Sequence, residues 1–221
     1  MTTQVLTQTS AMTRVYRNMA LSVLTTMIVA YVVGHNPALT ELFLTGAIKW
    51  VVLLAPIAMI FAFYAILQNT NSPALAHTLL QIFSAVMGLG LSSIFVQYNA
   101  SLITSAFLGA TVLFTTMATY GAVTKKDLTS WGSFLFIGLI ALIIVSIINL
   151  FTGSAALDFA LSGIGVIIFL GFTAYDVQKI QEMVAYDSNT NLEVMGAMSL
   201  YLDFINLFLD LLRVFGYLSD D

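Results

Sequence analysis

Long apolar stretches, separated by short polar turns, run through almost the whole chain. Seven stretches have about the 20 residues that an α-helix needs to cross a bilayer. They lie at residues 18–34, 46–67, 78–98, 102–122, 132–151, 157–178 and 196–218. The breaks between them are rich in Gly, Pro, Asn, Asp and Ser, which favour turns. The pattern therefore predicts an all-α integral membrane protein, a bundle of seven transmembrane helices.

The same pattern divides the chain into three parts. Residues 1–17 are polar and are predicted to form a disordered tail, residues 18–218 form the membrane domain, and residues 219–221 form an acidic C-terminal end. A secretory signal has a short basic start and a small-residue cleavage site. Neither feature precedes the first span, so we expect that span to be retained.

Composition narrows the function classes. The chain has 221 residues, of which 59% are hydrophobic and only 8% charged, and it has no cysteine. A soluble domain is about 25% charged, so the expected surroundings are the lipid bilayer. Without cysteine there are no disulfides, thiolate metal sites or cysteine nucleophiles. The net charge is −4, and the sequence has no basic block that would bind nucleic acid. Nothing in the sequence indicates a cofactor.

Lysine and arginine in short loops predict the orientation, because cytoplasmic loops carry an excess of both. Arg14 and Arg17 precede the first span, Lys125–Lys126 lies between the fourth and fifth spans, and Lys179 follows the sixth. The opposite side has only Lys49 near a loop. The expected arrangement has the N-terminus in the cytoplasm and the C-terminus outside.

Polar residues form a stripe on the last span. Residues three and four positions apart share one face of a helix. The stripe consists of Ser199, Asp203, Asn206, Asp210, Arg213 and Tyr217. A charged Asp or Arg at mid-membrane costs on the order of 2.5–3.5 kcal/mol, so the stripe should not face lipid. We therefore predict that the last helix lies inside the bundle and turns this face toward protein or water.

A second carboxylate is expected near Asp203. Asp176 closes the sixth span on the cytoplasmic side, and Asp203 lies about 12 Å into the last span from that side, at 1.5 Å per residue. The two depths match if the sixth helix continues past the membrane edge, which Val177–Val184 permits because it lacks Gly and Pro. Two carboxylates that face each other do not both ionise readily, so they share a proton or bind a cation.

Structural ion pairs are the alternative for two of these acids. Asp210 and Arg213 are three residues apart and can neutralise each other, and Asp176 could pair with Lys179. Asp203 has no basic neighbour on its own helix, so it most needs a functional explanation. Calcium takes six to eight oxygen ligands. Asp176 and Asp203 would bind it only weakly, which suits passage better than storage.

Four segments resemble the Bax inhibitor-1 family, the transmembrane Bax-inhibitor-motif proteins, and within it the bacterial branch. They cover most of the second half of the chain, while the first 75 residues match only in hydropathy. The segments are GLGLSSIFVQYNASLITSAF (88–107), TYGAVTKKDLTSWG (119–132), GFTAYDVQKI (171–180) and SLYLDFINLFLDLLRVFG (199–216).

The resemblance implies a seven-helix bundle with the last helix central and a pH-sensitive calcium leak governed by an aspartate pair. By position, that pair would be Asp176 and Asp203, with Ca²⁺ or H⁺ as the ligand and the stripe lining the path. In this family a bacterial relative interacts with a membrane-bound AAA protease, so the resemblance implies such a protease as a possible partner. The chain departs from the family at Asp210, where many relatives are apolar. It also lacks the basic residue of span two that would latch the pair, since Lys49 lies at the opposite end of that span.

Other classes fit less well, and no enzyme function is expected. An intramembrane aspartyl protease would match at Tyr175–Asp176, but Asp203 follows Leu200–Leu202 instead of a Gly-x-Gly stretch. A retinal protein would need a lysine on the last span, where there is none, and His35 and His77 lie on opposite sides of the membrane. The remaining alternative is a regulator that binds other membrane proteins, with transport incidental.

Overall fold

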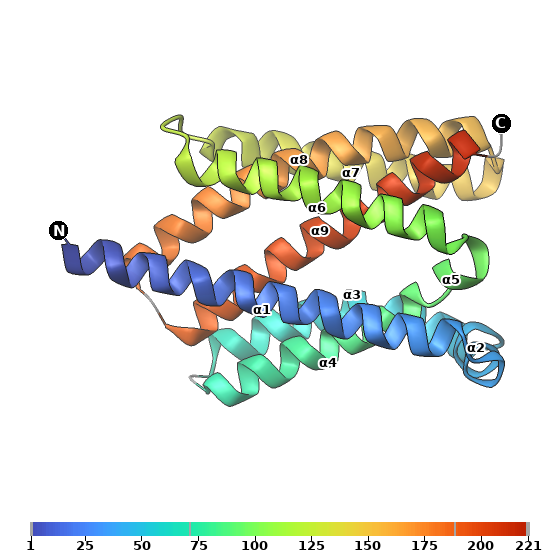
Figure 1. The fold of residues 1–221 in the computed structure, drawn as a ribbon, viewed down its shortest axis with the longest axis horizontal. Helices are drawn as coiled ribbons and strands as arrows, with labels where there is room; N and C mark the ends of the chain where they lie inside the picture. Colours follow the sequence, from blue (N-terminus) through green and yellow to red (C-terminus); the bar gives the residue numbers. More distant parts are fainter. Residues whose placement is uncertain (1, 71, 188, 220–221) are drawn as a thin grey trace. The chain divides into compact units, whose positions relative to one another are not determined.

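The computed structural model describes residues 2–70, 72–187 and 189–219, so the predicted acidic end at Asp220–Asp221 lies outside it. Every regular element in this part of the chain is helical (Figure 1). The helices are α1 (Thr2–Gly34), α2 (Pro37–Leu44), α3 (Ile48–Gln68), α4 (Pro73–Leu91), α5 (Ile94–Gln97), α6 (Ala100–Val123), α7 (Thr129–Thr152), α8 (Ala155–Tyr186) and α9 (Thr190–Ser219).

Within these residues, seven helical segments are long and apolar enough to cross a membrane, as the hydrophobic pattern predicts. They are α1 from Gln8 onward, α4 together with α5, and each of the five other long helices. Turn chemistry sets the boundaries. Asn36 and Ser72 cap α2 and α4 immediately before a proline, and Gly153 ends α7 at a φ of 61°, a left-handed conformation that favours glycine.

The first helix begins earlier than the sequence suggested. We predicted a disordered tail over residues 1–17, but α1 extends back to Thr2. Ala11 and Val15, four residues apart, are fully buried, and Arg14 between them forms an ion pair with Glu193. The polar composition concealed an apolar face, and burial of that face stabilises the helix.

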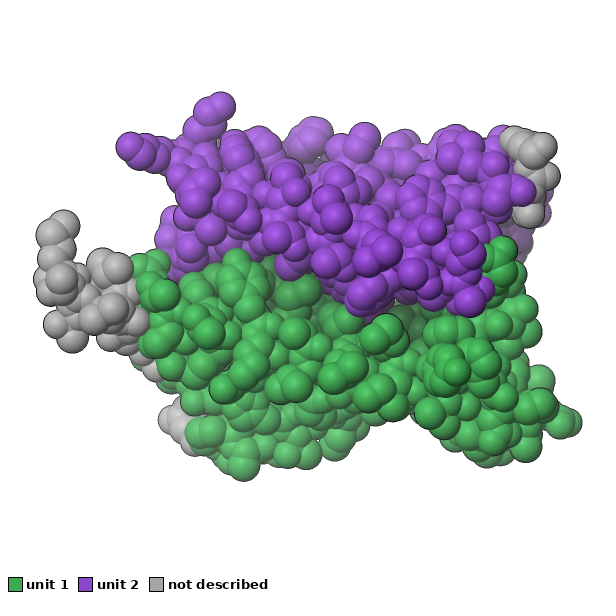
Figure 2. Space-filling model, in the orientation of Figure 1, with its two compact units in different colours: residues 1–99, 183–201 green, residues 100–182, 202–221 purple. Residues whose placement is uncertain are grey.

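The chain forms two compact units (Figure 2), residues 1–99 with 183–201 and residues 100–182 with 202–221. In the first unit, α1 packs along α4, and α3 packs on α4. Gly88 of α4 allows the close approach, because a Cβ there would lie 2.7 Å from the Thr26 carbonyl oxygen of α1.

The second unit contains α6, α7, most of α8 and the C-terminal part of α9. Gly121 of α6 lies directly against the backbone of Ala174 in α8, so a side chain at 121 would have no room. The ring of Phe204 on α9 makes edge contacts with Phe107 and Phe114 of α6, with centroids 5.5 and 5.7 Å apart. These aromatic contacts fix the side of α9 that faces α6.

The last helix contributes to both units and is the most buried span. Of its most apolar window 67% is buried, against 11 to 33% for the other six. Tyr201, at the end of its first-unit part, is fully buried. This burial confirms the prediction that the last helix is a buried one. Of its polar stripe, Asp203 and Asp210 are buried, whereas Arg213 is exposed.

Candidate functional site: a carboxylate pair on α8 and α9

Asp203 is a buried acid in the part of α9 that belongs to the second unit. It is 6% exposed, between the buried residues Phe204 and Tyr201. Its Oδ2 atom is fully enclosed and has no hydrogen-bond partner among the described residues. A buried polar atom without a partner carries a free-energy cost of about 1–3 kcal/mol. A proton or a cation on this oxygen would remove that cost.

Asp176 lies on α8, in the same unit, close enough to Asp203 for the two carboxylates to interact electrostatically. Helix α8 continues without a break to Tyr186, as the depth argument required. Asp176 is half-buried while Asp203 is buried. The structure thus brings together the two acids that the sequence paired, with one of them nearer to solvent.

Lys179 does not neutralise Asp176 through a direct ion pair. Among the described residues, ion pairs join only Arg14 to Glu193 and Arg213 to Asp210. Lys179 is near enough to interact electrostatically with Asp176, but its Nζ lies 5.4 Å from the ring centroid of Tyr175. This geometry is typical of a cation–π contact.

The rest of the stripe is divided between different environments. Arg213 Nη1 donates to Asp210 Oδ1 at 2.7 Å, which confirms the predicted structural pair. Asn206 donates to the Leu202 carbonyl of its own helix. Tyr217 stacks on Phe159 with centroids 4.6 Å apart.

Ser199 belongs to the first unit, where its hydroxyl lies 3.3 Å from that of Tyr64 on α3. Only Asp203, of the six stripe residues, interacts with Asp176 through a contact that the structure records. The residues of the predicted stripe therefore share one face of α9 but interact with different groups.

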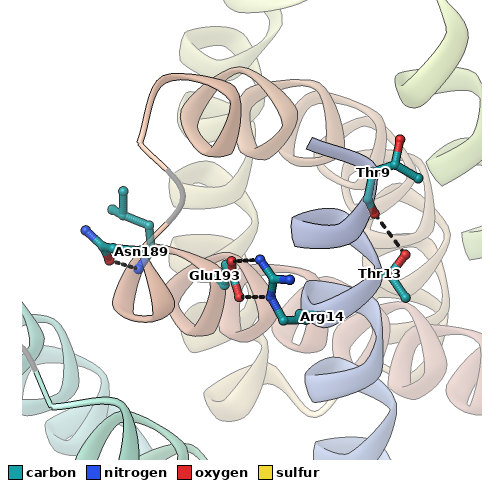
Figure 3. Close-up of polar contacts among 6 residues, drawn as sticks. Thr9, Thr13, Arg14, Asn189 and Glu193 are labelled. Atoms are coloured by element: carbon teal, nitrogen blue, oxygen red, sulfur yellow. Dashed lines mark hydrogen bonds and ion pairs between the residues drawn. The ribbon is translucent and has the colours of Figure 1, made fainter. Parts of the chain in front are cut away.

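An ion pair that the sequence analysis missed joins α1 to α9. Figure 3 shows the guanidinium of Arg14 facing the carboxylate of Glu193, with N–O distances of 2.7 and 2.6 Å to its two oxygens. One turn before Glu193, the Asn189 side chain accepts from Leu192 N at 3.0 Å and so caps the start of α9. The pairing of Arg14 was missed because we assigned this residue to a disordered tail.

Helix α1 has a polar stripe of its own, which could have revealed this pair. Arg14, Asn18, Ser22 and Thr26 recur every four residues, and the last three are buried. The Thr26 hydroxyl lies 2.7 Å from the Tyr201 hydroxyl and donates to the Ser84 carbonyl. Asn18 Nδ2 and Ser22 Oγ have no hydrogen-bond partner among the described residues.

The carboxylate pair can bind a proton or a weakly held cation. Within the described residues no group of three or more His, Cys, Asp or Glu side chains could hold a metal ion. Two carboxylates with carbonyl oxygens and water supply fewer strong ligands than a tight calcium site contains. Such a site exchanges its ion readily, which is a requirement for conduction.

Comparisons with known proteins place these residues in a known family of sequences. The family model described as "Inhibitor of apoptosis-promoting Bax1" matches residues 8–220. The inner membrane protein YbhL of Escherichia coli K12 is 39% identical over 212 residues, which are 93% of this chain and 90% of that protein. Proteins of Rickettsia prowazekii and Borreliella burgdorferi are 37% and 34% identical, over 95% and 99% of this chain and 90% and 96% of their own lengths.

Proposed function

The chain belongs to the Bax inhibitor-1 family of membrane proteins, and on that premise we propose that it is a pH-sensitive cation leak channel or transporter. Calcium is the expected ion, and Asp176 and Asp203 form the gate between the last two long helices. The observation that carries the proposal is the enclosed Oδ2 of Asp203, which has no hydrogen-bond partner within the described ranges while a second carboxylate lies nearby. Ionisable residues within a membrane that lack a structural partner mark ion or proton pathways by default.

The gate works through the number of protons on the pair. When the two carboxylates share a proton, their mutual repulsion is relieved and the pair is stable without a cation. When the proton leaves, a cation must replace it. Because the ligands are few, the cation is held weakly and can pass on.

Calcium entry into proteoliposomes tests this proposal. Purified protein is reconstituted in pure lipid, and entry is compared from about pH 6 to about pH 8. We expect wild type to conduct with a clear pH dependence and Asp203→Asn to lose that dependence. Asp127→Asn is the matched control, because Asp127 is an exposed carboxylate outside the spans. Unchanged flux and pH dependence in an Asp176→Asn, Asp203→Asn double variant would sink the proposal.

The second candidate is a regulator that binds other membrane proteins, such as a membrane AAA protease. It is favoured by the first turns of α1, which precede Arg14 in the chain and have exposed side chains at Thr9 and Ser10. Deleting residues 2–13 removes these turns, including the buried Ala11 and Met12, but keeps Arg14 and Glu193 in the chain. A regulator would then lose its partner in a pull-down, whereas a channel would still conduct in pure lipid.

For the location we propose the bacterial inner membrane, with the N-terminus in the cytoplasm and the C-terminus outside. The related YbhL protein is named an inner membrane protein. Arg14 and Arg17 in the first half of α1, and Lys125 and Lys126 between α6 and α7, support this orientation under the positive-inside rule. Because the chain has no cysteine, a single cysteine at Lys125 reports its side cleanly. Labelling of that cysteine from the periplasm by an impermeant maleimide would overturn this orientation.

A further inference from the structure

The polar stripe of α1 is joined to α9 at both of its ends, within the first unit. At the start of the stripe, Arg14 donates to both oxygens of Glu193, at 2.7 and 2.6 Å. At its end, the hydroxyl of Thr26 lies 2.7 Å from that of Tyr201. Between Arg14 and Thr26, α1 rises about 18 Å at 1.5 Å per residue. The middle of the stripe is therefore held against α9 from both sides.

The middle of the stripe consists of Asn18 and Ser22, which are 4% and 0% exposed. Asn18 Nδ2 and Ser22 Oγ are enclosed, and neither atom has a hydrogen-bond partner among the described residues. A polar group that is buried without a partner destabilises the folded state, most of all in a span that bulk water does not reach. Residues four apart are neighbours on a helix surface, so a single ligand can serve both groups.

The groups at the two ends of the stripe are already paired. Both oxygens of Glu193 accept from Arg14. At the other end, the single proton of the Thr26 hydroxyl goes to the Ser84 carbonyl, at 2.8 Å. Tyr201 is therefore the donor in its contact with Thr26. Both hydroxyl protons at this end are thus used, and neither is left for Ser22.

The residues of α9 midway between Glu193 and Tyr201 are small. Gly196 and Ala197 lie there, and both are buried. Ala197 shares a helix face with Glu193 and Tyr201, because the three residues are spaced four apart. Neither Gly196 nor Ala197 has a hydrogen-bonding side chain, and their small size leaves more room beside α1 than a larger side chain would.

Water is the ligand whose chemistry fits these two groups. Arg14 and Glu193 neutralise each other at the start of the stripe, so an ion between Asn18 and Ser22 would be buried without a counter-charge, which is costly. The Cβ atoms of residues four apart on a helix are about 5–6 Å apart. One water molecule bridges such a span with a hydrogen bond to each side chain.

We propose that a buried water molecule binds between α1 and α9, accepting from Asn18 Nδ2 and donating to Ser22 Oγ. Buried waters of this kind pair with polar groups that the protein leaves unpaired, and they are costly to remove. The water stabilises the packing of α1 on α9 by supplying the hydrogen bonds that the middle of the stripe lacks. The proposal requires neither conduction nor the carboxylate pair, which lies in the second unit.

Nuclear magnetic resonance of the full-length protein in detergent micelles tests this site. Asparagine is isotopically labelled, and rotating-frame transfer of magnetisation from water to the side-chain amide protons is recorded, since its sign separates direct contact from proton exchange. Asn191 is the matched control, because it is 6% exposed and its amide donates to the Leu67 and Thr70 carbonyls. We expect water contact at Asn18 and none at Asn191. Equal transfer at the two amides, or none at Asn18, would overturn the proposal.

Two serine variants test the second partner of the water. Ser22→Ala removes that partner, and we expect the transfer at Asn18 to fall several-fold. Ser84→Ala is the matched control, because Ser84 is also 0% exposed but its hydroxyl donates to the Leu80 carbonyl of its own helix. This variant should leave the transfer at Asn18 unchanged. Undiminished transfer in Ser22→Ala would rule the site out.

Unfolding of Ser22→Ala by SDS in mixed micelles gives an independent readout. If water pairs with the Ser22 hydroxyl, the variant loses a hydrogen bond, so we expect its unfolding midpoint at a lower SDS fraction than that of wild type. If the space beside Ser22 is dry, the variant loses only an unpaired buried hydroxyl and is stabilised. A midpoint at a higher SDS fraction would therefore contradict the proposal.

Discussion

Two acids on α9 are buried to a similar degree but differ in the hydrogen bonds that their oxygens accept. Glu193, in the first unit, is 3% exposed, and Asp203, in the second, is 6% exposed. Arg14 holds both oxygens of Glu193, whereas Asp203 Oδ2 has no partner among the described residues. Burial alone therefore does not identify a functional acid. What separates the two acids is the hydrogen bonding of their oxygens, because Arg14 neutralises Glu193 through both oxygens.

Asp210 is intermediate between these two cases. One of its oxygens accepts from Arg213, and the other has no partner in the part of the chain that the structure describes. Arg213 is itself 44% exposed, so solvent screens part of the pair. Among the described residues, the three acids form a series from two hydrogen bonds with an arginine, through one, to none, and each step of that series can be tested separately.

The largest expected effect is the loss of stability in Arg14→Ala. Removing one partner of a buried ion pair leaves the other charge uncompensated, which costs about 3–5 kcal/mol. The Arg14 side chain is 39% exposed, so we expect the lower end, about 3 kcal/mol. The measurement is the free energy of unfolding from SDS titration in mixed micelles.

Asp203→Asn provides the contrast for that measurement. It replaces an acid that forms no ion pair with any described residue by a neutral side chain of the same shape, so we expect a change within about 1 kcal/mol. The comparison between the two acids fails if Asp203→Asn destabilises as strongly as Arg14→Ala. Such a result would mean that Asp203 is a structural residue with a partner of its own.

A smaller effect is expected for Arg213→Ala. This variant breaks one hydrogen bond instead of two, and the Arg213 side chain that it removes is 44% exposed. We expect a loss of about 1–2 kcal/mol in the same SDS titration. Arg213→Lys keeps the charge without the planar fork and should recover part of the loss. A loss of stability equal to that of Arg14→Ala would mean that Asp210, like Glu193, is a fully structural acid.

Much of this architecture could be predicted from the sequence. Apolar stretches separated by turn residues predicted the seven spans, because the length of a bilayer-crossing helix is fixed by geometry. The spacing of the stripe predicted that α9 is buried, and the Asp210–Arg213 pair followed from the distance between neighbours on one helix. The four matching segments predicted the family that the comparisons show.

The features that could not be predicted depend on which helices meet. The pairing of Arg14 with Glu193 joins residues 179 positions apart, and hydropathy carries no information about such a contact. The same holds for a cavity lined by Ser146 of α7, Asp158 of α8 and Arg213 of α9, since its shape depends on the packing of three helices. The helical state of residues 2–17 was missed for another reason, because its buried face contains small side chains such as Ala11 that a hydropathy scan undervalues.

The smallest expected effect concerns Asp127, an acid that lies outside the spans and has hydrogen bonds instead of an ion pair. Its Oδ1 accepts from Thr129 N at 2.8 Å at the start of α7. Donation from the Thr129 side chain and then from its backbone lowers the pKa of Asp127 below its ordinary value. A lowered pKa stabilises the folded state above the ordinary pKa, and this contribution is lost as pH falls through the folded-state value.

We therefore expect Asp127→Ala to lower Tm slightly at neutral pH, with the difference from wild type shrinking below about pH 4. Thr129→Val removes the hydroxyl but keeps the backbone N–H, so its effect should be smaller than that of Asp127→Ala. A difference that grows in acid would contradict the assignment, because an acid stabilised as its anion cannot gain from protonation. The effect is small because Asp127 is exposed, whereas the effect of losing the partner of the buried Glu193 is large. Asp127 thus extends the series to an acid that solvent itself can stabilise.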